Sequence, residues 1–424
     1  MREYTALTPF GRRCYAGDMM EPLLENIKVI EVAEWGFVPS AAAVLCDWGA
    51  EVIKIEHPER GDPMRGLVSG GLIAPVPGYN YMVEQMNRGK RDLGLDLNKP
   101  AGLEIFLRLI EDADVLVTSF LEPARQRLKI TYEDLSALNP RLIYARGHGQ
   151  GQRGPDSDKA GFDVVSYWSR SGVAHMLTPL DGQFVMQRAA FGDVMTGVTL
   201  AGGIAAALYR RSVTGKGGLI DVSLFGTALW NIAPDIISSH MLGKDPREAV
   251  GGPGVKITPN PLVGIYRSAD RRMIMLNMLQ SDRYWPGLCR VMEREDLIED
   301  ARFATFESRG EHREELADII KSAFASRLAA ELLQRLADNE CVFASAQTAM
   351  EAAVDVQTVA NGYLVANPDH PDGKLVASPV QYNNGMFEPT RGAPEMGQHT
   401  EEILQELGFG WDNIAELKEQ KVIN

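Results

Sequence analysis

The chain has 424 residues, 45% of them hydrophobic and 24% charged, which is the composition of an ordinary globular protein with room for two or three packed units. Its formal net charge of −14 disfavours binding to nucleic acid or to an anionic membrane, so an anionic ligand needs a local basic cluster. Cys14, Cys46, Cys289 and Cys341 are scattered, which predicts reduced thiols in a cytoplasmic protein and no disulfide frame. No apolar run approaches the length of a membrane span, and the first 20 residues lack the apolar core of a secretory signal.

The first half of the chain alternates predicted strands and helices. Residues 27–32 ("IKVIEV") and 51–56 ("EVIKIE") are β-branched and apolar, and a helical stretch with Pro39 at its start lies between them. Two such strands with an intervening helix form a βαβ unit and therefore a parallel sheet. A further helix at 100–113 and strands at 114–120 and 141–147 continue the pattern. We therefore expect a doubly wound α/β domain over residues 25–225, preceded by an arm at 1–24.

The sequence pattern changes after residue 225. A linker is predicted at 226–259 because residues 249–261 are rich in glycine and proline. Residues 260–345 predict a small α+β domain, with two strands around a turn and then helical sequence that breaks near Ser326. Residues 346–424 predict a second linker, which returns to the large domain and ends in a helix with Thr400 as its N-cap.

The first strand is followed by "EWGFVPS", which places Trp35, Gly36 and Phe37 at the carboxyl edge of the sheet, where ligands of open α/β sheets bind. Core packing explains Trp35 and Phe37 equally well. The first strand does not lead into a G-x-G-x-x-G, and the chain has no Walker sequence, which argues against a nicotinamide, flavin or ATP site. The seven histidines are dispersed, so a metal site is not expected.

Basic residues gather in loops on the predicted carboxyl edge, where they could hold a polyphosphate, although a short charge run is more often a solvated turn. They are Arg60, Arg65, Arg88, Lys90, Arg91, Arg125 and Arg127. His148 lies in the glycine-rich "RGHGQGQRG" and could act as a base, although a histidine in a loop more often has no such role.

Asp193 stands between Gly192 and a long run of small and apolar residues that predicts a helix. An aspartate in this place suits an N-cap, and the positive end of the helix favours its ionised form. The position alone favours a cap over a nucleophile.

Several stretches together resemble class III CoA-transferases, the formyl-CoA and carnitine-CoA transferase type. They run in family order from about residue 24 to 410: "GAEVIKIEHPERGDPMR", "NRGKRDLGLDL", "ADVLVTSF", "LNPRLIYARGHGQGQRGP", "GDVMTGVTLAGGIAAAL", "TGKGGLIDVSL" and "GQHTEEILQELG". The resemblance implies a Rossmann-like large domain and a small domain, joined by linkers that interlock two chains into a homodimer.

The same resemblance implies roles for individual residues. Asp193 matches the nucleophile, and a family lysine aligns with Ala160, next to Lys159. Matches to the CoA-binding positions are Trp35, Gly36, Phe37, Arg65, Arg88, Lys90, Arg91, Ser119, Phe120, Ala124 and Arg127. Phe162, Trp168 and Gln280 are expected in the substrate pocket.

Phe162 distinguishes two branches of the superfamily. The related α-methylacyl-CoA racemases have a histidine at this position, because they need a second acid/base group. They also have a glutamate that corresponds to Gln280. Phenylalanine cannot carry a proton, which argues for transfer over racemisation. The chain also lacks the four-glycine run of formyl-type transferases and has only "GGPG" at 251–254.

The resemblance therefore implies an enzyme that moves CoA from an acyl-CoA to a carboxylic acid through an aspartyl-CoA intermediate. CoA is a substrate here, and no tightly bound cofactor or metal is expected. The alternatives are a 2-methylacyl-CoA racemase and, from another class, a non-catalytic acyl-CoA-binding or Rossmann-type nucleotide-binding protein. Donor and acceptor acids stay open.

Overall fold

A computed structural model describes residues 21–67, 70–71, 73–179, 182–245, 247 and 258–424. The chain divides into two compact units, and both are discontinuous in sequence. Unit 1 contains residues up to 171, 187–231 and 357–424, and unit 2 contains 172–186 and 232–356. The predicted arm at 1–24 lies almost wholly outside the described residues, and so does the glycine-rich end of the predicted linker at 249–257.

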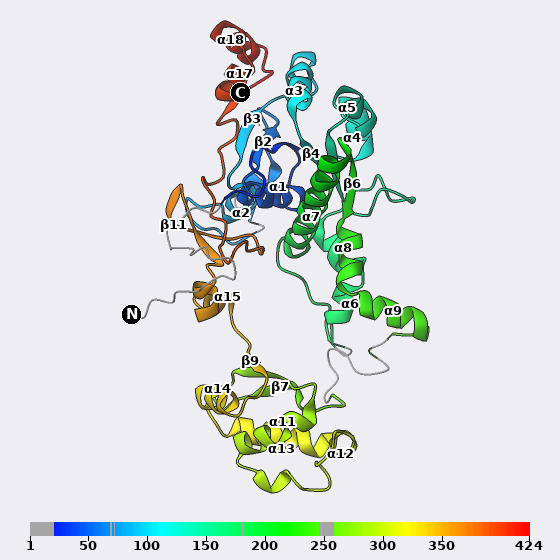
Figure 1. Cartoon of the computed structure of the whole chain (residues 1–424), viewed down its shortest axis with the longest axis vertical. Helices are drawn as coiled ribbons and strands as arrows, with labels where there is room; N and C mark the ends of the chain where they lie inside the picture. The colour runs from blue at the N-terminus through cyan, green and yellow to red at the C-terminus, as the bar shows by residue number, and fades with distance from the viewer. Residues whose placement is uncertain (1–20, 68–69, 72, 180–181, 246, 248–257) are drawn as a thin grey trace. The chain divides into compact units, whose positions relative to one another are not determined.

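A parallel six-stranded sheet forms the centre of unit 1 (Figure 1), which confirms the predicted α/β class. The strand order is β3-β2-β1-β4-β5-β6, and every neighbouring pair is parallel. Most positions of β1, β2, β4 and β5 are buried, as expected for strands covered on both faces. The strands are β1 Lys28–Val32, β2 Glu51–Glu56, β3 Arg91–Gly94, β4 Val115–Thr118, β5 Ile143–His148 and β6 Gly218–Ser223.

Helices cover both faces of this sheet. Ile30 and Val32 of β1 pack into a core with α3 (Pro100–Asp112) and α5 (Tyr132–Leu138). The opposite face is covered by α1 (Phe37–Asp47) and by α7 (Phe191–Thr214), which pack on each other. The remaining helical segments before residue 232 in unit 1 are η1 (Pro63–Gly66), α2 (Tyr81–Asn87), α4 (Glu122–Leu128), the π-helical η2 (Val164–Ser169) and α8 (Leu224–Asn231).

The end of the chain returns to unit 1, as expected from the sequence. It forms α16 (Val356–Ala360), the hairpin β10–β11 (Leu364–Asn367 and His370–Val376), α17 (Thr400–Glu406) and α18 (Trp411–Glu419). Ile403 and Ile414 join the core that contains β1 and α3. Thr400 is not the N-cap that the sequence predicts, because His399 occupies that position. The Thr400 hydroxyl instead accepts the N–H of Gly94 at 3.1 Å and donates to Asn424 Oδ1 at 2.8 Å.

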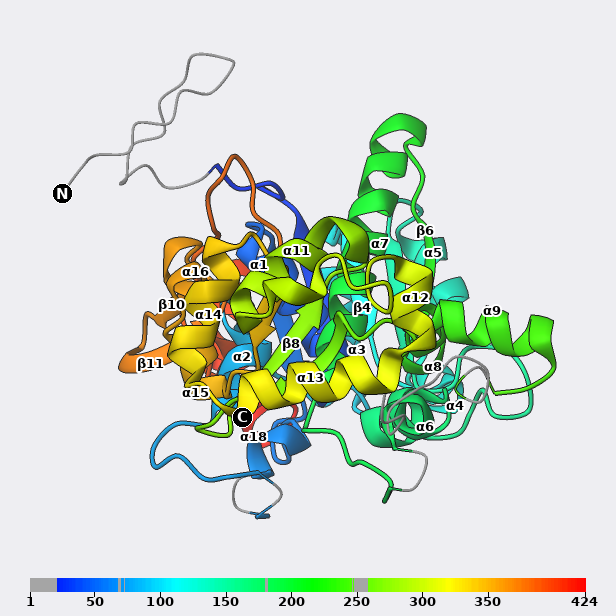
Figure 2. The ribbon, with the colours of Figure 1, turned by 90° about the horizontal axis from the view of Figure 1, so that it is seen from below.

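Unit 2 contains the antiparallel sheet β7-β8-β9 (Val263–Arg267, Met273–Asn277 and Phe343–Ser345) and helices around it (Figure 2). The two predicted strands and the helical break at Ser326 are confirmed, since α13 ends at Ala325 and α14 starts at Ala329. Its other elements are α6 (Val173–Leu177), α9 (Ala233–Leu242), α11 (Ser281–Met292), η3 (Glu295–Leu297), α12 (Phe306–Glu311), α13 (Arg313–Ala325), α14 (Ala329–Asp338) and α15 (Ala349–Ala353).

Helix α7 differs from the sequence-based expectation about membrane spans. By length and composition alone it could cross a membrane, and it is the one helix in the described part of the chain that meets this test. Leu200, Ala201, Ile204 and Leu208 are buried, and this face packs on α1 and the sheet. The core helix of a globular protein passes the same test, so the finding alone does not indicate a membrane protein.

Candidate active site

A cavity of about 500 Å³ opens at the carboxyl ends of β1, β2, β4 and β5. This is the edge at which ligands of open α/β sheets bind. All of its lining residues belong to unit 1. Of the residues that the sequence assigned to the site, eight line the cavity: Trp35, Phe37, Ser119, Phe120, Ala124, Arg127, Phe162 and Asp193.

Asp193 lies in the first turn of α7, whose N-cap position is occupied by Ala190 with a left-handed backbone (φ 61°). The helix start faces the start of α1, where Gly36 makes room for the carboxylate. A Cβ atom on Gly36 would lie 2.4 Å from Asp193 Oδ2, so only glycine fits this approach. Within the described residues the Asp193 carboxylate accepts no hydrogen bond, and it is therefore free to meet a ligand.

Asp163, and not Asp193, satisfies the N-terminus of α7. Its two carboxylate oxygens accept the Gly192 N–H at 3.1 and 3.0 Å, and it also accepts the Asp193 N–H. The preference for a cap at Asp193 is therefore wrong. The sequence missed Asp163 because a capping side chain is normally sought next to its helix, and this one comes from 30 residues upstream.

Burial and the negative charge of Asp163 raise the pKa of Asp193 to about 7. This is the opposite direction from the sequence-based expectation that the helix end keeps the carboxylate ionised. The cost of removing the charged form from water exceeds the help it receives from the helix terminus. A carboxylate in this state is poorly solvated, and it titrates near neutral pH.

The loop between β1 and α1 is fixed from several sides. Trp35 has a left-handed backbone (φ 71°), and its N–H donates to Asp62 Oδ1 at 3.1 Å. Asp62 is held in turn by the buried Lys54, whose Nζ also donates to Glu31 Oε1 at 2.9 Å. The Trp35 ring meets Phe162 edge-on, with 5.4 Å between ring centroids. This loop presents Trp35 and Phe37 to the cavity as rigid apolar walls.

The predicted cationic cluster does not line the cavity. Arg88 forms a two-pronged ion pair with Asp47, with distances of 3.0 and 2.7 Å. Lys90 lies 2.6 Å from Glu31 Oε2, and Arg91 pairs with Glu51, Glu402 and Glu406. Arg88 and Lys90 lie in the turn between α2 and β3, and Arg91 is the first residue of β3. This turn is buried and is not the solvated turn that the sequence suggested.

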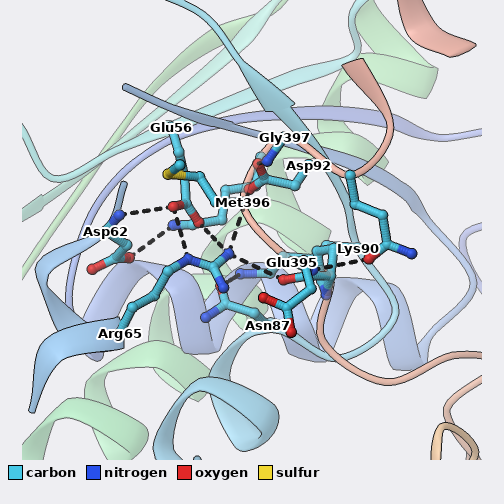
Figure 3. A network of polar contacts seen from close by, with 12 residues as sticks. Glu56, Asp62, Arg65, Asn87, Lys90, Asp92, Glu395, Met396 and Gly397 are labelled. Atoms are coloured by element: carbon cyan, nitrogen blue, oxygen red, sulfur yellow. Dashed lines mark hydrogen bonds and ion pairs between the residues drawn. The ribbon is translucent and has the colours of Figure 1, made fainter. Parts of the chain in front are cut away.

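Arg65 also binds carboxylates of its own chain. Its guanidinium donates to Glu56 at 2.9 and 2.7 Å, and Figure 3 shows it within a network that includes Asp62 and Asp92. Asp92 accepts the Gly397 N–H at 2.6 Å, which ties the C-terminal segment to β3. Arg65 thus lies behind the cavity wall that Glu56 and Asp62 form.

Two arginines line the cavity without an ion pair to any described residue. Arg127 was expected there from the sequence, and Arg60 was noted as a basic loop residue but not chosen as a site residue. Both are exposed. His57 and Asn98 line the same cavity. His57 directly follows β2, which is the signal that could have found it, whereas Asn98 lies in the turn after β3. His148 also lines it, and its Nε2 contacts Asp221 Oδ1 at 3.2 Å.

The other predicted residues lie away from the cavity lining. Trp168 is buried and packs edge-on against Phe191 with 5.8 Å between centroids. Lys159 is exposed and pairs with Asp156, whereas its neighbour Ala160 lines the cavity. Gln280 is exposed at the N-cap position of α11 in unit 2. No group of three or more residues able to hold a metal ion gathers among the described residues.

Comparison with known proteins identifies the family. The model of CoA-transferase family III matches residues 24–400. The chain is similar to (R)-2-hydroxy-4-methylpentanoate CoA-transferase of Clostridioides difficile, with 33% identity over 95% of this chain and 99% of the relative. It is also similar to cinnamoyl-CoA:phenyllactate CoA-transferase of Clostridium sporogenes, with 30% identity over 95% and 97% of the two chains.

Other relatives transfer CoA between dicarboxylic acids. Succinate–glutarate CoA-transferase of Agrobacterium fabrum is 30% identical over 91% of this chain and 96% of the relative. Among solved structures, a CaiB/BaiF family protein from Brucella suis superposes with a TM-score of 0.76 at 27% identity, covering 91% of this chain and 99% of that chain. The chain therefore belongs to CoA-transferase family III and is an acyl-CoA:carboxylate CoA-transferase.

Proposed function

We propose that the enzyme moves CoA between two carboxylic acids through a covalent intermediate on Asp193. The observation that carries this proposal is a carboxylate that accepts no hydrogen bond within the described residues and lies at a helix start in an apolar-walled cavity. Covalent catalysis of this kind divides one difficult exchange into easier steps.

Four steps complete a turnover. An ionised Asp193 oxygen attacks the donor thioester carbonyl, which forms a mixed anhydride and breaks the C–S bond to release CoA thiolate. The thiolate attacks the aspartyl carbonyl, giving an aspartyl-CoA thioester and the first free carboxylate. The acceptor carboxylate attacks this thioester, which forms a second anhydride and frees the thiolate again. The thiolate then attacks the acceptor acyl carbonyl, and Asp193 returns as a carboxylate.

The cavity walls suit this sequence of steps. Trp35, Phe37 and Phe162 offer apolar surface around Asp193 and would limit the access of water, which would hydrolyse an anhydride. Arg60 and Arg127 lack ion-pair partners among the described residues, so they can face the phosphates of CoA. CoA is a substrate in this scheme, and the scheme requires no resident cofactor.

The lining also supports a choice among acids. Besides the free arginines, the charged side chains that line the cavity are carboxylates and the two histidines His57 and His148. A second carboxylate on the acyl group would lack a dedicated partner there. We therefore favour acids with one carboxylate and an apolar side chain, as in the two clostridial relatives, over dicarboxylic acids. In competition assays, 4-methylpentanoate-type and aromatic acids should react about tenfold or more faster than succinate or glutarate.

The chain lacks the second acid/base group that racemisation needs at the position of Phe162. Phe162 lines the cavity beside Trp35 and cannot exchange a proton, and the named relatives are transferases. The absence of solvent deuterium at the α-carbon of recovered acyl-CoA would agree with this assignment.

A homodimer fits an apolar surface on unit 1. Trp230, Tyr209 and Val213 are 84%, 74% and 70% exposed on α8 and α7, and Phe191 and Met195 are also exposed. Large apolar surfaces of this kind usually mark an interface. The family resemblance and this surface together support a second copy of the chain as the partner.

A trapping experiment tests the covalent step. Incubation with an acyl-CoA, followed by hydroxylamine or borohydride and peptide mapping, should place one modification at Asp193. Asp193→Asn should give no adduct and no transfer, while it still binds CoA. Full transfer by Asp193→Asn, or an adduct on another residue, would refute the proposal.

A further inference from the structure

Two carboxylates meet at the start of α7, and they have different surroundings. Asp163 is 6% exposed, and both of its oxygens accept the Gly192 N–H. It also accepts the N–H of Asp193 itself. Asp193 accepts nothing from the described residues and lines the cavity. One carboxylate thus takes the helix N–H groups, and the other is left for substrate.

The packing around Gly192 leaves Asp163 little freedom. A Cβ atom on Gly192 would lie 2.4 Å from Asp163 Oδ1 and 2.2 Å from Cγ of the Tyr167 ring, so the turn is in close contact with η2. The Thr196 hydroxyl donates to the Gly192 carbonyl at 2.7 Å and fixes the next turn. Asp163 directly follows Phe162, which lines the cavity. Phe162, which forms part of the cavity wall, and Asp163, which anchors the turn that carries Asp193, are therefore adjacent residues.

We propose that Asp163 is a positioning residue, which anchors the first turn of α7 by its backbone and holds a second negative charge beside Asp193. The inference rests on the proposed function, in which Asp193 is the nucleophile. Since Asp163 satisfies the helix terminus, the Asp193 side chain does not fold back onto its own backbone, as a capping aspartate would. It stays extended toward the cavity.

Asp163 acts on Asp193 through its charge as well as through its hydrogen bonds. Burial and the nearby Asp163 raise the pKa of Asp193. Burial also raises the pKa of Asp163, and the N–H groups that Asp163 accepts oppose this rise by favouring its ionised form. Tyr167 is the other titratable group described at this turn, and its pKa is raised by burial and by Asp163. The facing start of α1 contributes Gly36 and Ser40, which do not titrate.

Two substitutions separate the roles. Asp163→Asn keeps an oxygen that can accept an N–H but removes the charge, whereas Asp163→Ala removes both. Two readouts are needed. The first is the pH dependence of labelling of the Asp193 peptide by a water-soluble carbodiimide, which reacts with protonated carboxyl groups and needs no substrate. The second is the rate of aspartyl-CoA formation in a single turnover. Asp134→Asn, at the N-terminal capping box of α5, is the matched control.

For Asp163→Asn we expect the labelling midpoint and the acid limb of adduct formation to move together, by about one pH unit, to lower pH. For Asp163→Ala we expect adduct formation to slow by at least tenfold at every pH, with acyl-CoA binding retained. Asp134→Asn should change neither readout. Unchanged midpoints and rates in both Asp163 variants, with or without a lower melting temperature, would overturn the inference. If wild-type enzyme forms no adduct, the proposed function fails, and the labelling midpoints still decide whether Asp163 sets the protonation of Asp193.

Discussion

In the proposed mechanism the Asp193 carboxyl must lose its proton before it can attack a thioester, and its pKa of about 7 would make this step dependent on pH. The same burial that raises the pKa also removes the hydration shell that would weaken the carboxylate as a nucleophile. Below neutral pH the raised pKa keeps most of the Asp193 carboxyl protonated, which opposes the gain in nucleophilicity from lost hydration. Above neutral pH the carboxyl is ionised, and the lost hydration then favours its attack. In the proposed mechanism we therefore expect this single residue to set the pH range in which the enzyme works.

The rate of aspartyl-CoA formation should fall about tenfold for each pH unit below 7 and level off above it, because only ionised Asp193 reacts. Stopped-flow or quenched single-turnover measurements from pH 5 to 9 would show this limb. A limb centred near pH 4, the ordinary range of an aspartate, would contradict the role of burial.

Gly36→Ala should lower kcat by about tenfold to hundredfold, because the new Cβ would lie 2.4 Å from Asp193 Oδ2 and would displace the carboxylate. Gly202→Ala is the matched control, since a Cβ atom there would meet nothing within 4 Å. Steady-state kinetics and melting temperatures of both variants separate misplacement from loss of stability. Equal kcat in the two variants would count against the close approach of α1 to Asp193.

At the scale of elements, β3 shows how a charged run can belong to a core. Arg88 and Lys90 lie in the buried turn before β3, Arg91 starts the strand, and each meets a carboxylate from another element. A buried ion pair adds little net stability compared with well-packed apolar side chains of similar volume. Removing one partner, however, leaves the other charge buried without compensation. We therefore expect these cations to act in folding, and we propose the exposed Arg60 and Arg127 as ligand-binding residues.

Arg88→Ala should destabilise the protein by about 3–5 kcal/mol, because Asp47 would remain buried without its partner. It should leave the KM for acyl-CoA unchanged. Arg127→Ala should do the reverse, raising this KM with little effect on stability. Urea unfolding and steady-state kinetics of both variants provide the comparison, and a raised KM in a stable Arg88→Ala would return the cluster to the CoA site.

Local patterns in the sequence predicted the strands β1, β2, β4 and β5 and the edge at which the cavity opens. They did not predict interactions between distant segments. The capping of α7 by Asp163 and the pairing of Arg91 with Glu402 join residues 29 or more positions apart, and neither has a local signature. The resemblance placed Asp193 and Phe162 in one site, which periodicity alone could not. Expectations based on residue type alone failed at two buried places. Burial raises the pKa of Asp193, which was expected to be ionised, and it encloses the basic cluster at β3, which was expected to meet solvent or ligand.

At the scale of the whole molecule, the exposed apolar residues of α7 and α8 call for a covering surface. A double change, Tyr209→Lys with Trp230→Lys, should shift the molar mass in light scattering from two chains of 46.6 kDa to one. Trp411→Lys on α18 is the control, because Trp411 is 67% exposed on a different element. A monomeric wild-type protein at micromolar concentration would contradict the dimer.

The discontinuity of unit 1 has a consequence for the newly made chain. Arg91 and Glu402 are separated by 311 residues, so at roughly 5–20 residues per second the ribosome needs about 15–60 s to deliver the carboxylate. During that interval the Arg91 guanidinium has Glu51 but lacks its two partners on α17, and β3 has an edge that α17 and the segment around Ile423 will later cover. The large unit cannot finish folding behind the ribosome, and the nascent chain has to be kept from aggregating until its last segment emerges.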